Sequence, residues 1–269
     1  MLKFSRSAVL LLTAVAIVPL AGCAGGKKGR PDTAYVARDV SSLYTAAKRT
    51  MDGGDYEQAA KLFDEVERQH PYSAWARRAQ LMSAFNYYLS RKYPEAINSA
   101  QRFVTIHPGN SEAPYAQYLI GMSYYQQIDD VTRDQTTTQQ ASDAFGELIR
   151  RYPDTRYAGD ARIKLDLIRD HLAGKEMEIG RFYQRSGQWL GATYRFRTVV
   201  DQYQTTTHTP EALERLVESY LALGVPEEAQ EAAAVLGRNY PESYWYKQSL
   251  RLLGRENQQA SKRRTASRK

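Results

Sequence analysis

The residues that could carry out chemistry are few and lie far apart in the sequence. The four histidines, at positions 70, 107, 171 and 208, are scattered along 269 residues, and Cys23 is the single cysteine. A zinc site needs ligands grouped at short spacing, and many hydrolases and nucleotide-binding enzymes carry a His-Glu-x-x-His, Gly-x-Ser-x-Gly or P-loop motif. None of these patterns occurs in the sequence. We therefore expect no enzyme activity, no metal and no cofactor.

Cys23 is the residue whose position indicates a specific modification. It follows a short apolar stretch, residues 8–20, which is preceded by two basic residues and is too short to span a bilayer comfortably. Residues 1–22 are thus typical of an export signal. The Leu-Ala-Gly-Cys sequence at residues 20–23 looks like a bacterial lipobox. We expect cleavage before Cys23, an S-diacylglycerol group on its sulfur and an N-acyl group on its new amine. The alternative is a chance cysteine after an ordinary signal.

The residues after Cys23 indicate where the lipid would anchor the chain. Residue 24 is an alanine and not the aspartate that resembles an inner-membrane retention mark in lipoproteins of Gram-negative bacteria. We therefore expect the outer membrane, with the protein facing the periplasm. Residues 23–38 are rich in glycine and lysine and predict a lipidated, flexible tether. Several acyl chains anchor a protein firmly where one would be marginal. A lipid anchor would therefore attach the chain to the membrane.

The remaining composition is that of an ordinary globular protein, with 42% hydrophobic and 25% charged residues. A formal net charge of +7 is modest, and an exported chain does not meet nucleic acid, so we expect no nucleic-acid partner. Part of the positive charge is concentrated in residues 254–269, which lack an apolar period. This segment predicts a basic disordered tail.

Between the tether and the tail, a pattern of small residues, aromatic residues and prolines recurs. Antiparallel helices pack closely where a small residue on one faces an aromatic residue on the other, and proline is tolerated just beyond a helix end. The spacing is that of tetratricopeptide repeats. We predict an all-α fold, a right-handed solenoid of about five helix pairs. The recurring residues are Ala59, Ala96, Ala141, Ala192 and Ala229, then Phe63, Phe103, Phe145 and Phe196, then Pro71, Pro108, Pro153 and Pro241.

Two irregular segments divide the repeats into halves. Residues 127–139 are polar and threonine-rich and predict a long loop within the third repeat. Apolar residues at near-helical spacing over residues 158–185 predict a long linking helix. We therefore expect an N-terminal half, residues 39–157, with repeats one to three. The C-terminal half, residues 158–253, would hold the linking helix with repeats four and five.

The first helix of each repeat offers candidate binding residues. Positions three or four apart on such a helix share a face, and in stacked repeats that face lines a concave surface. The register predicts an aromatic groove with a basic edge at Lys48. The alternative, core packing between helices, stays open for each aromatic residue. The groove positions are Tyr44, Leu81, Phe85, Tyr88, Tyr118, Met122 and Tyr125.

Several local sequences, together with the lipobox, resemble the BamD (ComL) family of lipoproteins of the outer-membrane β-barrel assembly machinery. The resemblance covers the chain after the signal except the basic tail. It implies an adaptor that recognises unfolded outer-membrane proteins through an aromatic-rich C-terminal signal. It also implies contacts with the periplasmic domains of BamA through the C-terminal half, beside other Bam lipoproteins. The matching sequences are Phe63-Asp64, His70-Pro71-Tyr72-Ser73, Tyr124-Tyr125, Arg133-Asp134, Gln139-Gln140-Ala141 and Gly187-Gln188-Trp189.

The resemblance also implies two partner-binding residues in the fourth repeat. Trp189 matches the family's Gly-x-Trp turn, and Arg195 matches an arginine associated there with the BamA contact. Trp and Arg often dominate the binding energy of interfaces. Trp189 could instead fill the core between repeats. Two other functions remain as alternatives to the adaptor: a general periplasmic repeat scaffold, for example in cell-wall coordination, and a helical cell-wall enzyme.

Overall fold

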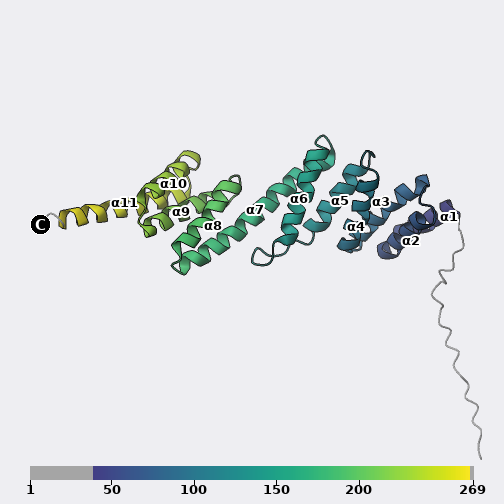
Figure 1. The fold of residues 1–269 in the computed structure, drawn as a ribbon, viewed down its shortest axis with the longest axis horizontal. Helices are drawn as coiled ribbons and strands as arrows, with labels where there is room; N and C mark the ends of the chain where they lie inside the picture. The colour runs from purple at the N-terminus through teal and green to yellow at the C-terminus, as the bar shows by residue number, and fades with distance from the viewer. Residues whose placement is uncertain (1–38, 267–269) are drawn as a thin grey trace, which may run out of the picture. The chain divides into compact units, whose positions relative to one another are not determined.

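Helices and the turns between them make up the part of the chain that the structure describes. The computed structural model describes residues 39–266 (Figure 1). The predicted export signal, the lipid site at Cys23 and the tether to residue 38 lie outside the described residues. The helices are α1 (Val40–Asp52), α2 (Tyr56–Gln69), α3 (Ala74–Leu89), α4 (Tyr93–Ile106), α5 (Ala113–Tyr125), α6 (Thr136–Arg151), α7 (Arg156–Arg185), α8 (Trp189–Gln202), α9 (Thr209–Leu223), α10 (Pro226–Asn239) and α11 (Tyr244–Ala266).

Short polar residues and prolines set the helix boundaries. The Asp55 side chain accepts a hydrogen bond from the backbone N–H of Gln58 at 3.1 Å, and Ser73 Oγ accepts one from Ala76 at 3.0 Å. Both side chains thereby satisfy amides that have no partner within the helix. The recurring prolines 71, 108, 153 and 241 each stand two residues after the end of a helix, as the sequence predicts. Helix α8 ends at Gln202, and Gln204 stands two residues later, where the other helices have proline.

The helices form antiparallel pairs that stack in chain order. Each helix packs against the next one along the chain, and α7 packs on α6 with its first half and on α8 with its second. The first helices of successive pairs also touch: α1 contacts α3, α3 contacts α5, and α5 contacts α7. These helices therefore line one face of the stack. This is the predicted tetratricopeptide arrangement of five helix pairs. Helix α11 packs against α9 and α10, the last pair of the stack (Figure 1).

Small and aromatic residues fill the core between the helices of a pair. All five recurring alanines are completely buried, as are Phe63, Phe145 and Phe196. A Cβ atom added to Gly121 on α5 would lie 2.6 Å from the Phe145 ring on α6. Only a residue without a side chain allows this approach of backbone to ring.

Three predicted boundaries differ from the observed ones. The prediction of a disordered tail from residue 254 is wrong up to residue 266, because α11 continues through this segment to Ala266. Lys and Arg are good helix formers, and they extend a helix already anchored on α9. The predicted loop at 127–139 is shorter, since Thr136 starts α6. The long helix begins at Arg156, where the side chain of Thr155 caps its first turn.

Candidate functional site

Half-buried aromatic side chains form a continuous strip across the first helices of three neighbouring pairs. Phe85 on α3 lies 6.3 Å from Tyr115 on α5, measured between ring centroids. Tyr115 lies 5.3 Å from Tyr157 on α7, and Tyr157 lies 5.4 Å from Tyr118 on α5. These distances are typical of interacting aromatic pairs. We call this set the aromatic strip; it comprises Phe85, Tyr88, Tyr115, Tyr118, Met122, Tyr125 and Tyr157.

Polar contacts hold the strip against α7. The hydroxyl of Tyr118 donates a 2.6 Å hydrogen bond to Asp160 Oδ2, and Lys164 Nζ lies 2.8 Å from the same carboxylate. Hydrogen bonds from Lys164 and then from Tyr118 lower the pKa of Asp160. Burial, followed by the bond to Asp160, raises the pKa of Tyr118. Asp160 therefore stays ionised and Tyr118 protonated. Lys164 also lies 5.8 Å from the centroid of the Tyr125 ring, close enough for a cation–π contact.

The strip contains most of the predicted groove residues. Phe85, Tyr88, Tyr118, Met122 and Tyr125 are all half-buried on α3 and α5. They pack against buried core clusters while part of each side chain stays accessible, so each residue has both a core contact and a surface. Leu81 is buried beside them.

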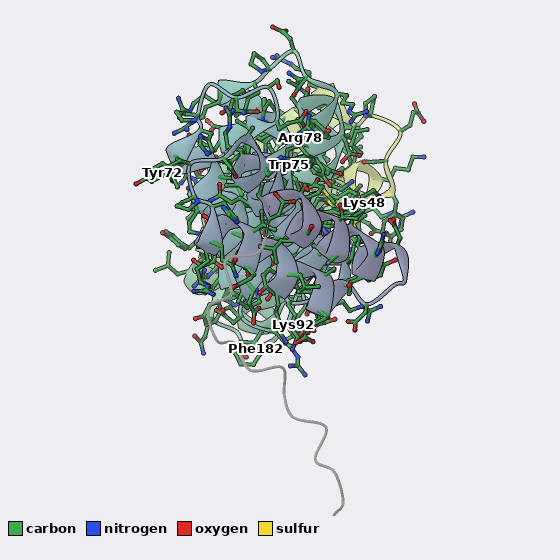
Figure 2. All side chains as sticks on the ribbon, turned by 90° about the vertical axis from the view of Figure 1, so that its right-hand side faces the viewer. Lys48, Tyr72, Trp75, Arg78, Lys92 and Phe182 are labelled. Carbon is green, nitrogen blue, oxygen red and sulfur yellow. The ribbon has the colours of Figure 1, made fainter. Side chains whose placement is uncertain are left out.

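Tyr44 and Lys48 are placed elsewhere. Tyr44 on α1 packs against Phe63, at 5.3 Å, and against Trp75, at 4.8 Å, in the first core cluster. Trp75 and Lys48 are labelled on the end of the stack formed by α1 to α3 (Figure 2). Lys48 pairs with Asp52 one turn further along its own helix, at 3.1 Å. The lysine that lies beside the aromatic strip is Lys164 on α7, and not Lys48.

Two members of the strip are absent from the groove that the sequence predicts. Tyr115 lies one turn before Tyr118 on the same helix, so its helical spacing was a usable signal. Tyr157 is the second residue of α7, the position that Trp75 has in α3, but the sequence pattern predicts a linking helix for this segment. Its contacts with Tyr115 and Tyr118 follow from how α7 crosses α5.

The predicted partner-binding residues on α8 are more enclosed than expected. Trp189 is the first residue of α8 and is half-buried. Arg195 forms an ion pair with Glu176 on α7, with Nη1 and Oε2 3.1 Å apart. Two neighbours outside the predicted set, Leu190 and Tyr194, are 74% and 70% exposed. They stand one turn apart on α8, opposite the buried register of the helix, and form its accessible apolar surface.

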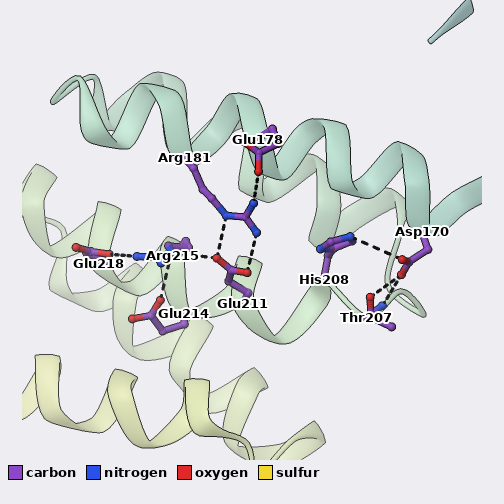
Figure 3. A network of polar contacts seen from close by, with 9 residues as sticks. All are labelled: Asp170, Glu178, Arg181, Thr207, His208, Glu211, Glu214, Arg215 and Glu218. Atoms are coloured by element: carbon purple, nitrogen blue, oxygen red, sulfur yellow. Dashed lines mark hydrogen bonds and ion pairs between the residues drawn. The ribbon is translucent and has the colours of Figure 1, made fainter. Parts of the chain in front are cut away.

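An ionic network joins α7 to α9 in the C-terminal half (Figure 3). Arg181 on α7 contacts Glu178 at 2.6 Å and Glu211 on α9 at 2.8 Å. Arg215 on α9 lies 3.0 Å from Glu218 and 3.8 Å from Glu214. Glu214 is 5% exposed, and its Oε2 has no hydrogen-bond partner. Burial raises the pKa of the Glu214 carboxyl to about 7.

A second junction lies nearer the middle of α7. The carboxylate of Asp170 accepts hydrogen bonds from the backbone N–H of Thr207, at 2.9 Å, and from its hydroxyl, at 2.7 Å. His208 lies 3.7 Å from the same carboxylate, and a Cβ on Gly174 would lie 3.2 Å from its ring. The turn between α8 and α9 is thereby attached to α7 (Figure 3).

Metal and membrane sites have their own structural requirements. Within residues 39–266, His, Cys, Asp and Glu side chains do not gather in groups of three that could hold a metal ion. None of the helices in the same range is long and apolar enough to cross a membrane.

Antiparallel helix pairs that stack in this register define a tetratricopeptide-repeat protein. Residues 36–236 match the model of the family YfiO, described as outer membrane lipoprotein. The chain belongs to this family.

Three curated relatives agree with this assignment, and all three carry the name outer membrane protein assembly factor BamD. The relative from Caulobacter vibrioides is 48% identical over 248 residues, covering 92% of this chain and 81% of the relative. The relative from Rickettsia prowazekii is 42% identical over 243 residues, covering 90% and 96%. The relative from Neisseria meningitidis serogroup A is 32% identical over 247 residues, covering 87% and 92%.

Proposed function

We propose that the chain is a non-enzymatic adaptor of the Bam complex, anchored in the outer membrane by lipid on Cys23 and facing the periplasm. In this function it binds unfolded outer-membrane proteins with one surface and the periplasmic domains of BamA with another, beside other Bam lipoproteins. Membership of an outer membrane lipoprotein family supports the location. The name assembly factor, carried by relatives that align with about nine-tenths of the chain, supports the process.

The aromatic strip is the observation that carries the proposal. An unfolded outer-membrane protein offers an extended segment with aromatic side chains, which needs a long surface rather than a closed pocket. Rings from α3, α5 and α7 provide such a surface. Aromatic side chains offer a large contact area and lose little rotamer entropy on binding. Phe85, Tyr88, Tyr118, Met122 and Tyr125 would therefore contact the segment.

The exposed face of α8 is the proposed BamA contact. Leu190 and Tyr194 would form its apolar centre, since both are largely exposed. Trp189 and Arg195 border this centre and are half-buried. Arg195 is held in place by its ion pair with Glu176. It would therefore contribute a positioned positive charge to the BamA contact, and little apolar area.

Two double variants test whether the surfaces are separate. Phe85→Ala with Tyr125→Ala should weaken binding of a C-terminal outer-membrane-protein peptide by about tenfold or more, because hot-spot aromatic residues carry most of such an affinity. Leu190→Ser with Tyr194→Ser should weaken binding of the BamA periplasmic domains instead. The second pair suits this test better than Arg195→Glu. That variant would place the new carboxylate beside Glu176, and the repulsion between the two negative charges would act on stability as well as on binding.

Each variant is the control for the other. Both affinities would be measured by titration after the helical spectrum and melting temperature of each variant have been checked. If both variants lose both partners equally while remaining folded, the two surfaces are not separate and the proposal is wrong.

A further inference from the structure

Helix α11 carries a row of basic side chains that the proposed function does not use. The inner face of the helix packs on the core of the C-terminal half through Leu252 and Leu253, which are half-buried. On the outer face, Lys247, Arg251 and Arg255 are exposed. They stand four residues apart, so they lie on one side of the helix. We call these three residues the basic stripe.

The two arginines of the stripe are not neutralised by the protein. Within residues 39–266, neither Arg251 nor Arg255 forms an ion pair with a carboxylate. The adjacent helix α10 has three exposed acidic residues, and none of them pairs with the stripe; they are Glu227, Glu228 and Glu231. The positive charges of Arg251 and Arg255 are therefore available to a partner outside the chain.

The last part of α11 is polar along its whole length. Figure 1 shows α11 continuing past α9 and α10. Residues 254–266 contain no apolar residue larger than alanine, and they hold four basic residues and one acidic residue, Glu256. A helix without an apolar side has nothing to bury against another protein. This end of the molecule therefore offers a basic surface without apolar anchors.

A basic surface of this kind fits a membrane surface better than a protein. The centre of a protein interface is depleted of charge, and its binding energy comes from side chains in desolvated pockets. An anionic phospholipid surface needs no such pocket, since each Lys or Arg near it adds roughly fivefold to binding through charge alone. The chain belongs to a family described as outer membrane lipoprotein, which supports a phospholipid surface as the partner.

We infer that the basic stripe of α11 binds the head groups of anionic phospholipids at the membrane surface. The contact is electrostatic and peripheral. The guanidinium groups of Arg251 and Arg255 donate hydrogen bonds to phosphate oxygens, and no side chain enters the hydrocarbon. This surface is separate from the aromatic strip and from the exposed face of α8, so the inference goes beyond the proposed function. It gives the C-terminal half its own attachment to the membrane, besides the lipid proposed on Cys23.

The test measures binding of the chain from residue 23 onwards to phospholipid vesicles by sedimentation. The chain carries Cys23→Ser, so that no acyl group contributes to binding. Vesicles that contain phosphatidylglycerol should bind it about tenfold more tightly than vesicles of pure phosphatidylcholine at about 50 mM salt, and the difference should disappear at about 1 M salt. Arg251→Gln with Arg255→Gln should weaken binding to the anionic vesicles by about tenfold or more, because two charges are lost.

A matched control has the same change of net charge at the other end of the stack. Arg77→Gln with Arg78→Gln, at exposed positions at the start of α3, should keep the binding to anionic vesicles. Three results would overturn the inference: equal binding of the unsubstituted chain to both kinds of vesicle, equal losses in the two double variants, or a loss of BamA binding without a loss of vesicle binding in the α11 variant. The third result would assign the stripe to a protein partner. None of them would affect the separate peptide and BamA titrations that test the proposed function.

Discussion

Gly180 on α7 and Phe196 on α8 are in direct contact across a helix pair. A Cβ atom on Gly180 would lie 2.5 Å from Cε1 of Phe196, closer than atoms can approach. Gly180 is buried, and Phe196 is completely buried in the core cluster of the C-terminal half. The pairing of a missing side chain with a ring therefore sets how closely α7 and α8 can pack.

Gly180→Ala should destabilise the fold. The added methyl group must displace the buried Phe196 ring or separate the two helices, and overpacking of this kind costs about 1–3 kcal/mol. The measurement is the free energy of unfolding in urea. Gly159→Ala on the same helix is the control, since a Cβ there meets nothing within 4 Å. It should stabilise the protein by roughly 0.5–1 kcal/mol through helix propensity. Equal effects of the two variants would contradict the close packing of Gly180 on Phe196.

Stability should fall as the pH rises towards 8, partly because of Glu214. The folded-state pKa of this carboxyl, about 7, lies above its ordinary value of 4.5. Its protonated form is therefore favoured by folding, and this contribution is complete below about pH 4.5 and lost as the pH rises through 7. At 1.36 kcal/mol per pKa unit, the contribution is roughly 3 kcal/mol.

Glu214→Gln, which imitates the protonated carboxyl, should remove this contribution. The difference in unfolding free energy between variant and wild type should grow in favour of the variant between pH 5 and pH 8. Glu231→Gln, at an exposed position on α10, should show a constant difference over the same range. A constant difference for Glu214→Gln too would mean that the carboxyl is ionised in the folded protein.

Arg195 and Glu176 should be energetically coupled. Their side chains are 33% and 19% exposed, so solvent screens the pair only in part. A double-mutant cycle with Arg195→Ala and Glu176→Ala should give a coupling of about 1 kcal/mol in unfolding free energy. The exposed pair Lys48 and Asp52 should give about 0.5 kcal/mol or less. Zero coupling for the first pair would show that the contact between Arg195 and Glu176 does not contribute to stability.

Cys23→Ser should prevent lipidation and leave the protein soluble or as an uncleaved precursor. The prediction depends on the lipobox at residues 20–23, and Cys23 lies outside the described residues. Membrane fractionation followed by intact-mass spectrometry would measure it. An unmodified Cys23 on mature, membrane-bound wild-type protein would refute it.

The sequence by itself determined the repeats and the family. Ala59 and Phe63, or Ala192 and Phe196, stand one turn apart on a single helix, so the 3.6-residue period alone places them on the same buried face. The prolines after the helices are equally local, because proline restricts only its immediate neighbours. Such short-range rules identify helix pairs without knowing what they pack against.

Only the tertiary structure decided which side chains meet across helices. Tyr118 finds Asp160 forty-two residues away, and Arg195 finds Glu176 rather than solvent. These contacts depend on the crossing and axial offset of neighbouring helices, which many side chains set together through packing. The same offset leaves Leu190 and Tyr194 exposed and brings Arg78 on α3 and Phe103 on α4 to a common cavity. No period within one helix encodes that relation.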